Sequence, residues 1–245
     1  MLLKPVKLAV VKNEIKLLRD YELRIGKICD STVFVAKQEA DNFNKELGES
    51  KAIAIPIGVD TDYFAYRGLR DEENVIGFLG AMSVAHNENA VRHFAQDILP
   101  LIIEKVPDVK FMVIGGGASD DLRKIQSEHI FFTGRVDDVR DYLEQCKIFV
   151  CPMTFGSGIK TKNLEAMAMG LPIVTTEIGA ENINAQSGSD WVVEMTDDTF
   201  ANAVVDLLMN DKKRKSIGRN GSIYVRENFT WDVAKNQFDV LLGNL

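Results

Sequence analysis

Short apolar runs recur along the chain from Asn74 onward and alternate with longer amphipathic segments. Such runs are typical of strands in a parallel sheet that is covered on both faces. The pattern predicts strands at Val75–Leu79, Lys110–Ile114, Ile130–Thr133, Ile148–Cys151, Ile173–Thr176 and Trp191–Glu194. It predicts helices at Glu88–Val106 with a break at Pro100, Ser119–Gln126, Val136–Gln145, Ile159–Met169, Asp197–Met209, Lys212–Glu227 and Trp231–Leu242. This alternation indicates an α/β domain with a doubly wound parallel sheet over residues 74–245.

The first 64 residues carry only part of a similar pattern. A helix over residues 1–28 is followed by a strand at Thr32–Ala36, a helix at Gln38–Leu47 and a strand at Ala52–Ile55. This segment is too small to be a domain, and its order is that of the last part of a parallel α/β sheet. We therefore interpret residues 1–64 as the C-terminal remnant of a preceding α/β domain, residues 65–73 as a linker, and the last helix as packing back toward the first domain.

The first helix allows two interpretations. Seven basic residues stand against three acidic ones in residues 1–28, so the helix could contact an anionic membrane. The favoured interpretation is a solvated basic face, with Ile15, Leu18 and Tyr21 packed inward.

Composition narrows the function classes. Of the residues, 46% are hydrophobic and 27% charged, which is ordinary for a soluble globular chain. The net charge of −7 and the absence of a basic run interleaved with aromatics argue against nucleic acid. Three cysteines without CxxC spacing suit a reducing compartment. No apolar run approaches the ~18 residues of a membrane span, so we expect a cytoplasmic protein, with peripheral contact at the inner face of the membrane as the alternative.

The stretch Cys151–Gly170 carries the strongest chemical signal. A loop with Gly156 and Gly158 leads into a helix whose start holds Lys160 and Lys162. The helix dipole and the unpaired amides at a helix start favour anions and disfavour cations, so two lysines there indicate a visiting anion. Glycines let backbone approach a ligand closely, and amides plus lysines form a phosphate site.

Farther along the same helix, Glu165 is flanked by Leu164, Ala166, Met167, Ala168 and Met169. A carboxylate on the buried half of a helix needs a partner. The alternative to a ligand site is structural: the lysines form a solvated face, and Glu165 pairs with one of them.

Glycines also follow the other expected strands, at Gly80, Gly115–Gly117 and Gly134. Ligands of doubly wound domains bind at the carboxyl ends of the strands, so these loops and the Gly156 loop should meet at one edge. A dinucleotide fingerprint is excluded because Asp120 replaces its third glycine. Neither a P-loop nor a nucleophile elbow occurs.

Histidines and carboxylates elsewhere offer little catalytic chemistry. His93 and His129 are expected to be structural, and only His86 should lie near the binding edge. Asp60 and Asp62 could hold a metal, but two carboxylates two residues apart also form turns, which is the favoured interpretation.

Six sequence blocks occur in this order: GVDTDYF, VIGFLGAM, FMVIGGG, IFFTGRVDDV, FVCPMTFGSGIKTKNLEAMAMGLPIVTTEIGAENI and FTWDVA. Their order resembles the nucleotide-sugar-binding half of retaining glycosyltransferases with the GT-B fold, of the family 4 or group 1 type. The strongest piece is EAMAMGLPIV, from Glu165 to Val174. The resemblance covers nearly the whole chain and implies a Rossmann-like GT-B C-terminal domain. It also implies that Glu165 holds the donor ribose and that the preceding loop gives amides to the diphosphate.

The chain departs from that family at three positions. Ser157 stands where a glutamate usually contacts the donor sugar, and Ala81 and Asn87 stand where an arginine and a lysine usually contact the diphosphate. The phosphate charge would then rest on Lys160 and Lys162. The donor-binding residues that we expect are Glu165, Lys160, Lys162, Ser157, Gly158, Ile159, Gly80, Ala81, Gly134, Arg135 and Val136.

The resemblance implies transfer of a sugar from a UDP- or GDP-sugar to a glycan or lipid-linked acceptor with retained stereochemistry. It implies no essential metal and no cofactor beyond the nucleotide-sugar substrate, and it assigns no catalytic residue in this chain. Two alternatives stay open: a non-catalytic nucleotide-binding subunit or fragment of a split enzyme, which would dock on an N-terminal partner chain, and a sugar-nucleotide epimerase on the same scaffold.

Overall fold

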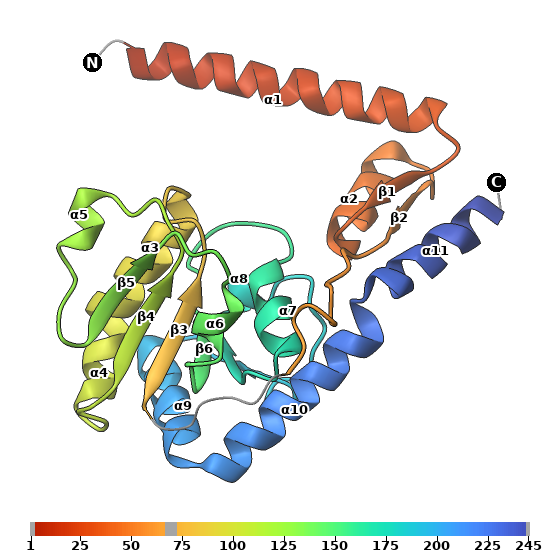
Figure 1. The fold of residues 1–245 in the computed structure, drawn as a ribbon. Coiled ribbons are helices and arrows are strands. Elements are labelled where there is room, and N and C mark those ends of the chain that lie inside the picture. The colour runs from red at the N-terminus through yellow and green to blue at the C-terminus, as the bar shows by residue number, and fades with distance from the viewer. Residues whose placement is uncertain (1–2, 67–72, 244–245) are drawn as a thin grey trace. The chain divides into compact units, whose positions relative to one another are not determined.

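The computed structural model describes residues 3–66 and 73–243 (Figure 1). The chain divides into two compact units. The smaller unit comprises residues 1–56 and 234–245, and the larger comprises residues 57–233.

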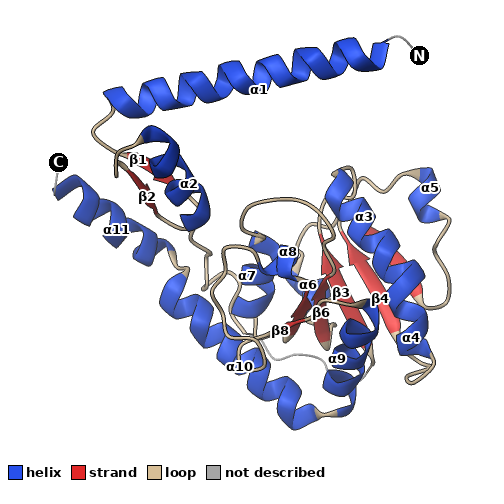
Figure 2. Ribbon diagram, turned by 180° about the vertical axis from the view of Figure 1, so that it is seen from behind, coloured by secondary structure: helices blue, strands red, loops and turns tan. Residues whose placement is uncertain are grey.

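The larger unit is built on a six-stranded sheet in which every pairing is parallel (Figure 2). The strands are β3 (Val75–Leu79), β4 (Lys110–Ile114), β5 (Ile130–Gly134), β6 (Ile148–Cys151), β7 (Ile173–Thr175) and β8 (Val192–Val193). Their order in the sheet is β5-β4-β3-β6-β7-β8. The chain therefore proceeds outward from β3 in one direction and outward from β6 in the other. The boundary between β3 and β6 is the topological switch point, where open α/β sheets bind ligands.

Helices cover the two faces of this sheet. They are α3 (Ala85–His93), the π-helical turn η1 (Phe94–Ile98), α4 (Leu99–Ile103), α5 (Asp120–Arg123), α6 (Arg140–Leu143), α7 (Thr161–Ala168), α8 (Glu177–Ala180), α9 (Asp197–Met209) and α10 (Asp211–Asn228). The last helix, α11 (Trp231–Gly243), belongs mostly to the smaller unit. η1, α4 and α9 pack together, and α7 packs on α10. Right-handed crossovers in opposite directions from the switch point place α3–α4 and α7 on opposite faces. The doubly wound α/β fold is thereby confirmed.

The expected break at Pro100 takes the form of a wider turn just before it. The amide of Leu99 donates to the carbonyl of Phe94, five residues back. Proline has no amide hydrogen and its ring needs space against the preceding turn, and a π turn supplies that space without ending the helix. The helical course therefore continues through the proline.

Three predicted helices are shorter than expected. α6 begins at Arg140 and not at Val136, because the Asp138 carboxylate accepts from the Arg140 amide at 2.9 Å and holds a turn before the helix. α5 spans only Asp120–Arg123. α7 begins at Thr161 and not at Ile159, because Lys160 has a ψ of 88°. Local backbone geometry and a side-chain contact thus make α6 and α7 begin later than the apolar period alone suggests.

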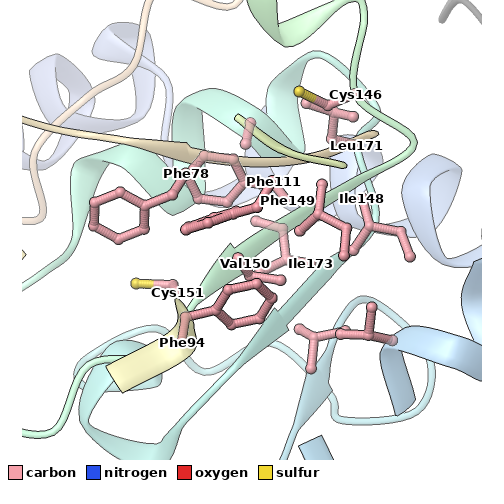
Figure 3. Packing of buried hydrophobic residues seen from close by; sticks show 14 of the residues in the cluster. Phe78, Phe94, Phe111, Cys146, Ile148, Phe149, Val150, Cys151, Leu171 and Ile173 are labelled. Atoms are coloured by element: carbon pink, nitrogen blue, oxygen red, sulfur yellow. The ribbon is translucent and has the colours of Figure 1, made fainter. Parts of the chain in front are cut away.

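Four phenylalanines lie among the mainly aliphatic side chains of the core of the larger unit (Figure 3). Phe78, Phe111 and Phe149 come from β3, β4 and β6, and Phe94 comes from η1; all are fully buried. The rings of Phe94 and Phe111 lie 4.5 Å apart, centroid to centroid, at a tilted angle. This core fixes β3 and β6 side by side, and with them the loops that follow each strand.

The smaller unit contains α1 (Leu3–Ile28), β1 (Thr32–Phe34), α2 (Lys37–Leu47) and β2 (Ala52–Ala54), with β1 and β2 paired in parallel. Its buried core consists of Ala40, Phe43, Leu47 and Ala52. None of the helices within residues 3–66 and 73–243 is both long and apolar enough to cross a bilayer.

The inward packing expected for α1 is wrong for three residues. Ile15, Leu18 and Tyr21 are 63%, 60% and 53% exposed. The helix instead turns Arg19 toward α2, where its guanidinium contacts Glu46 at 2.8 Å and the Phe43 ring at 5.4 Å. The contacts of Arg19 thus replace the expected apolar packing. Ile15, Leu18 and Tyr21, the apolar stripe of α1, stay exposed.

The boundary between the units falls after Pro56, earlier than the predicted end of the first segment at residue 64. Residues 57–64 belong with the larger unit for two reasons. The Val59 amide donates to the Phe229 carbonyl at 2.7 Å, and the Arg140 guanidinium lies 3.6 Å from the centroid of the Tyr63 ring. Residues 67–72 of the predicted linker lie outside the described residues, and the interpretation of residues 1–64 as a domain remnant stays a prediction.

Candidate functional site

Loops from both sides of the switch point meet at the carboxyl ends of the strands. The Gly80 amide donates to the Ile114 carbonyl at 3.0 Å, and a side chain at Gly115 would strike the Gly80 carbonyl. On the other side, a methyl group at Gly156 would lie 3.8 Å from His86. The Thr154 hydroxyl donates to the Asn89 side chain at 2.5 Å and ties the β6 loop to α3.

Next to the switch point, two helices begin without a side-chain cap. The N-cap residues are Val84 for α3 and Lys160 for α7, and neither side chain accepts a helix amide. In contrast, Ser119, Thr176, Thr196 and Asn210 cap α5, α8, α9 and α10. Gly156 and Gly158 have φ values of 120° and 79°, which L side chains rarely adopt. The two uncapped amino ends offer free amides and positive dipole ends to an anion.

Lys162 joins α7 to the β3 side of the site. Its ammonium donates to Asn87 Oδ1 at 2.5 Å and lies 4.3 Å from the centroid of the Phe78 ring. A methyl group at Gly80 would approach the same ammonium to 3.1 Å. Burial lowers the pKa of Lys162 and outweighs the opposing charges of Cys151 and Glu165, while Lys160 adds to the decrease. A nearby anion would offset the desolvation penalty of the charged Lys162 ammonium.

Lys160 is buried, with 7% of its surface exposed. Its ammonium donates to the Gly158 carbonyl at 2.6 Å and lies 3.7 Å from the Glu181 carboxylate. One oxygen of Glu181 is buried and has no hydrogen-bond partner among the described residues. Neither lysine is a solvated surface residue, so the structural alternative of a solvated lysine face does not fit the geometry.

Glu165 lies half-buried on α7. Its carboxylate makes no hydrogen bond and no ion pair within 4.0 Å in the part of the chain that the structure describes. Burial raises the pKa of Glu165, and the charge of Lys162 partly opposes this rise. The second half of the structural alternative, a direct pair between Glu165 and a lysine, is therefore also absent. A ligand with hydroxyl groups would supply the hydrogen-bond donors that this half-buried carboxylate lacks.

Glu165→Gln should stabilise the ligand-free chain at neutral pH. The folded pKa is raised, so the ionised carboxylate costs free energy that neutral glutamine does not. The gain should be absent below the ordinary glutamate pKa, grow as pH rises from there, and be complete above the raised pKa of the folded state. Urea unfolding at pH 4 and pH 8 measures it, with the exposed Glu227→Gln as the matched control. A loss of stability at pH 8 would contradict this account.

The remaining predicted residues occupy different parts of the edge. Gly158 and Ile159 are half-buried beside Lys160, and Ser157 and Ala81 are exposed. Arg135 and Val136 follow β5, two strands away from β3, and a methyl group at Gly116 would lie 3.3 Å from Arg135. Gly134 has a φ of 71° at the turn before them. Gly80, Lys160, Lys162 and Glu165 thus lie together at the switch point. The β5 loop with Arg135 and Val136 lies farther away, beyond the β4 loop.

Three site residues are absent from the predicted donor-binding set. Asn87 accepts from Lys162, His86 adjoins Gly156, and Glu181 faces Lys160. Burial lowers the pKa of His86, and Lys162 and Lys160 act in the same direction. His86 is marked in the sequence by its place after β3, and Asn87 also by standing where the family usually has a lysine, whereas Glu181 has no local signal.

The other candidate groups have structural roles. The His93 ring contacts Asp197 at 2.8 Å, and His129 Nδ1 contacts the Val109 carbonyl at 2.8 Å. Asp60 Oδ1 accepts from the amides of Asp62 and Tyr63, as the turn interpretation predicts. No cluster of three or more histidine, cysteine, aspartate or glutamate side chains with metal-binding geometry occurs within residues 3–66 and 73–243. Cys146 and Cys151 are buried and unpaired, and burial raises the pKa of Cys146 to about 12.

Comparison with known proteins gives a family match. A family model described as "Glycosyl transferases group 1" matches residues 73–210. Among curated relatives, the phosphatidyl-myo-inositol mannosyltransferase of Mycobacterium tuberculosis is 27% identical over 232 residues, covering 89% of this chain and 59% of the relative. A GDP-mannose-dependent alpha-(1-6)-phosphatidylinositol monomannoside mannosyltransferase of Mycolicibacterium smegmatis is 28% identical over 236 residues, covering 85% and 60%. The chain thus spans about three fifths of the length of these relatives.

Solved structures share the fold. TarM of S. aureus, in a structure with UDP, superposes with a TM-score of 0.76 at 17% identity, covering 91% of this chain and 45% of that one. The sucrose-phosphate synthase of Thermosynechococcus elongatus gives 0.74 at 18% identity, covering 94% and 61%. HepE of Anabaena, in a structure with UDP and glucose, gives 0.73 at 15% identity, covering 91% and 67%. These structures support the GT-B type of Rossmann-like fold.

Proposed function

This chain belongs to the group 1 glycosyltransferases, and we propose that it supplies the donor-binding half of an enzyme that transfers a sugar from a nucleoside diphosphate with retention. One observation carries the proposal. Two half-buried ions of opposite charge, Lys162 and Glu165, lie at the switch point beside two uncapped helix N-termini. A nucleoside diphosphate has both complementary parts, an anionic diphosphate and a ribose with hydroxyl donors.

The lysines and amides have a direct chemical task in this proposal. When the bond between the sugar and the diphosphate breaks, negative charge grows on the leaving group. Cations and oriented amides that already face that position stabilise this charge without reorganising. Lys162, Lys160 and the amino ends of α3 and α7 form such a set, which is why we expect no essential metal.

Glu165 acts in binding and not as a nucleophile. A glycosidase-type mechanism pairs two carboxylates about 5 to 9 Å apart. Among residues 3–66 and 73–243, the carboxylate with an observed contact to these lysines is that of Glu181, which faces Lys160 at 3.7 Å. We assign Glu165 to the ribose hydroxyls and Glu181 to the orientation of Lys160.

The proposed donor is a UDP- or GDP-sugar. A relative from M. smegmatis is described as GDP-mannose-dependent, and the HepE and TarM structures contain UDP. We assign the exposed Ser157, Ala81 and Arg135 and the half-buried Val136 to contacts with the sugar and the base. For the acceptor we propose a glycan or a lipid-linked sugar, because relatives act on phosphatidylinositol derivatives by name. A cytoplasmic protein with peripheral membrane contact would suit that acceptor.

Glu165→Ala should lower the affinity for nucleoside diphosphates by about tenfold to a hundredfold, because a hydrogen bond to a charged group contributes about 1.5 to 3 kcal/mol. Calorimetric titration with UDP and GDP measures the loss, and Glu165→Gln should lose affinity while it gains stability. Glu227→Gln serves again as the control. Unchanged affinity together with lower stability would show that Glu165 has only a structural role.

A second candidate is the non-catalytic subunit of a split enzyme. Two features of the smaller unit favour it: the exposed apolar stripe of α1, and a core of only a few buried side chains around a two-stranded sheet. So little buried surface rarely stabilises an α/β layer by itself. An acceptor-side domain, on the same chain or on a partner chain, would cover that stripe. Size-exclusion chromatography with an acceptor-side domain tests this docking, and a transfer assay of the resulting complex separates the two candidates.

A further inference from the structure

A cavity of about 430 Å³ lies in the larger unit, at the end of the strands opposite to the site described above. Lys147 precedes β6 and Pro172 precedes β7, so the cavity opens at the amino ends of these strands. The cationic residues that line it are Lys147, Arg214, Lys215, Arg219 and Arg226, and none of the described lining residues is acidic. In a chain with a net charge of −7, this is a local reversal of charge.

We propose that this cavity binds a phosphate-bearing amphiphile, with the phosphate at the cations and the apolar part against Tyr66, Pro172 and Ile223. Its volume falls within the range of small-molecule sites, about 300 to 1,000 Å³. The proposal is independent of the nucleotide site, because the two lie at opposite ends of the strands.

Four of the five cations, all except Lys147, belong to α10. Lys215, Arg219, Ser222 and Arg226 follow one another at spacings of four, three and four residues, which places them along a single stripe of the helix. Arg214 is buried at the start of the stripe, where its guanidinium donates to the Leu207 carbonyl at 3.1 Å. Arg214 and Lys215 also pair with Asp211, at 2.8 Å and 4.0 Å, so the uncompensated positive charge of this stripe comes from Arg219 and Arg226.

Arg219 is the cation available to a ligand. It is exposed, and it makes no hydrogen bond or ion pair with any residue in the described ranges. By comparison, the Arg226 guanidinium donates to the Thr61 carbonyl at 3.3 Å, and the Lys147 ammonium donates to Asn74 at 3.1 Å. A guanidinium presents a fork of donors that matches two phosphate oxygens, which favours phosphate over other anions.

The walls of the cavity are held by backbone contacts. A side chain at Gly218 would strike the Gly170 carbonyl, so α10 packs closely on the turn before β7. The Ser222 hydroxyl donates to the Ala168 carbonyl at 3.0 Å, and a methyl group at Gly170 would lie 3.0 Å from the Tyr66 ring. The cavity is therefore preformed, which lowers the entropy lost on binding.

The same phosphate chemistry occurs in soluble phosphate esters and in anionic lipid headgroups, and two arms of one experiment distinguish them. The first arm titrates the chain with dihexanoyl phosphatidic acid below its micellar concentration, by calorimetry. The second measures cosedimentation with phosphatidylcholine vesicles that do or do not contain phosphatidic acid. Binding in the first arm identifies a soluble or extractable ligand, and binding in the second arm alone identifies a membrane surface. Both results support the proposal.

Arg219→Glu should weaken binding in the active arm by at least about tenfold, and Ile223→Glu should do the same by placing a charge on the apolar wall. Lys212→Glu is the matched control, because it makes the same change of charge on the same helix outside the cavity. Circular dichroism and thermal melting check that each variant folds. Binding in neither arm, or an equal loss with Lys212→Glu, would overturn the proposal.

Discussion

Replacing Lys160 and Lys162 together with glutamine should weaken the binding of UDP or GDP by at least about a hundredfold, while the affinity for the corresponding nucleoside changes little. Each lysine contributes a charge next to the uncapped start of α7, and charge-assisted hydrogen bonds contribute about 1.5 to 3 kcal/mol each. Calorimetric titration of both ligands against both proteins gives the difference. Higher salt should reduce the difference in affinity between the diphosphate and the nucleoside, because screening weakens the attraction between the lysines and the phosphates.

The control for this pair is Lys124→Gln with Lys212→Gln, two exposed lysines of the same unit. The control should bind both ligands as the unmodified chain does. A double variant at positions 160 and 162 that loses stability but keeps its preference for the diphosphate would show that the buried lysines serve only a packing network with Glu181.

The pH dependence of the same titration tests Lys162 separately. Burial lowers the pKa of Lys162, and a bound diphosphate would favour its charged form. Affinity should be complete where Lys162 is protonated and decline as pH rises through the lowered pKa, before an ordinary lysine would titrate. Binding in that range should take up protons, which titrations in buffers with different ionisation heats detect. In Lys162→Arg the decline should move to higher pH.

The sheet could be predicted from the sequence because its strands are short apolar runs with clear ends. Val75–Leu79, Lys110–Ile114 and Ile148–Cys151 have the expected bounds. Parallel strands covered on both faces leave this signal in the sequence irrespective of their neighbours. The start of α6 could not be predicted in this way, because it depends on one contact between the Asp138 carboxylate and the Arg140 amide.

The site itself could be predicted only in part. The conflict between a helix start and two lysines is local, so Lys160 and Lys162 stand out in the sequence. The partners of these lysines are not local. Lys162 reaches Asn87, 75 positions earlier, because β3 and β6 are neighbours in the sheet. Glu181 reaches Lys160 from the segment after β7. Strand order decides both contacts, and the apolar pattern of the strands does not encode it.

The orientation of α1 shows a different limit. Its apolar positions predict a buried stripe, yet Ile15, Leu18 and Tyr21 are exposed while Arg19 and Gly26 face α2. Periodicity locates the apolar face of a helix but does not identify what covers it.

The chain from residue 1 to 245 should bind a nucleoside diphosphate but transfer sugar at least about a thousandfold more slowly than a form that also carries an acceptor-side domain. The groups that would hold the donor lie within the larger unit, so binding needs no other domain. Transfer also needs the acceptor hydroxyl held against the sugar carbon, and correct positioning can contribute about 7 to 11 kcal/mol to barrier lowering. A closing domain also excludes water from the reacting bond.

Radiolabelled UDP-glucose and GDP-mannose, offered with a lipid extract and with oligosaccharides, measure transfer, and release of nucleoside diphosphate measures hydrolysis separately. Adding an acceptor-side domain should restore transfer, and Glu165→Ala should abolish that recovery. Rapid transfer by the chain alone would contradict the prediction and would place an acceptor site within it. Failure of the added domain to restore transfer, with nucleotide binding intact, would favour the non-catalytic subunit, because the donor site would then be present without a reaction to serve.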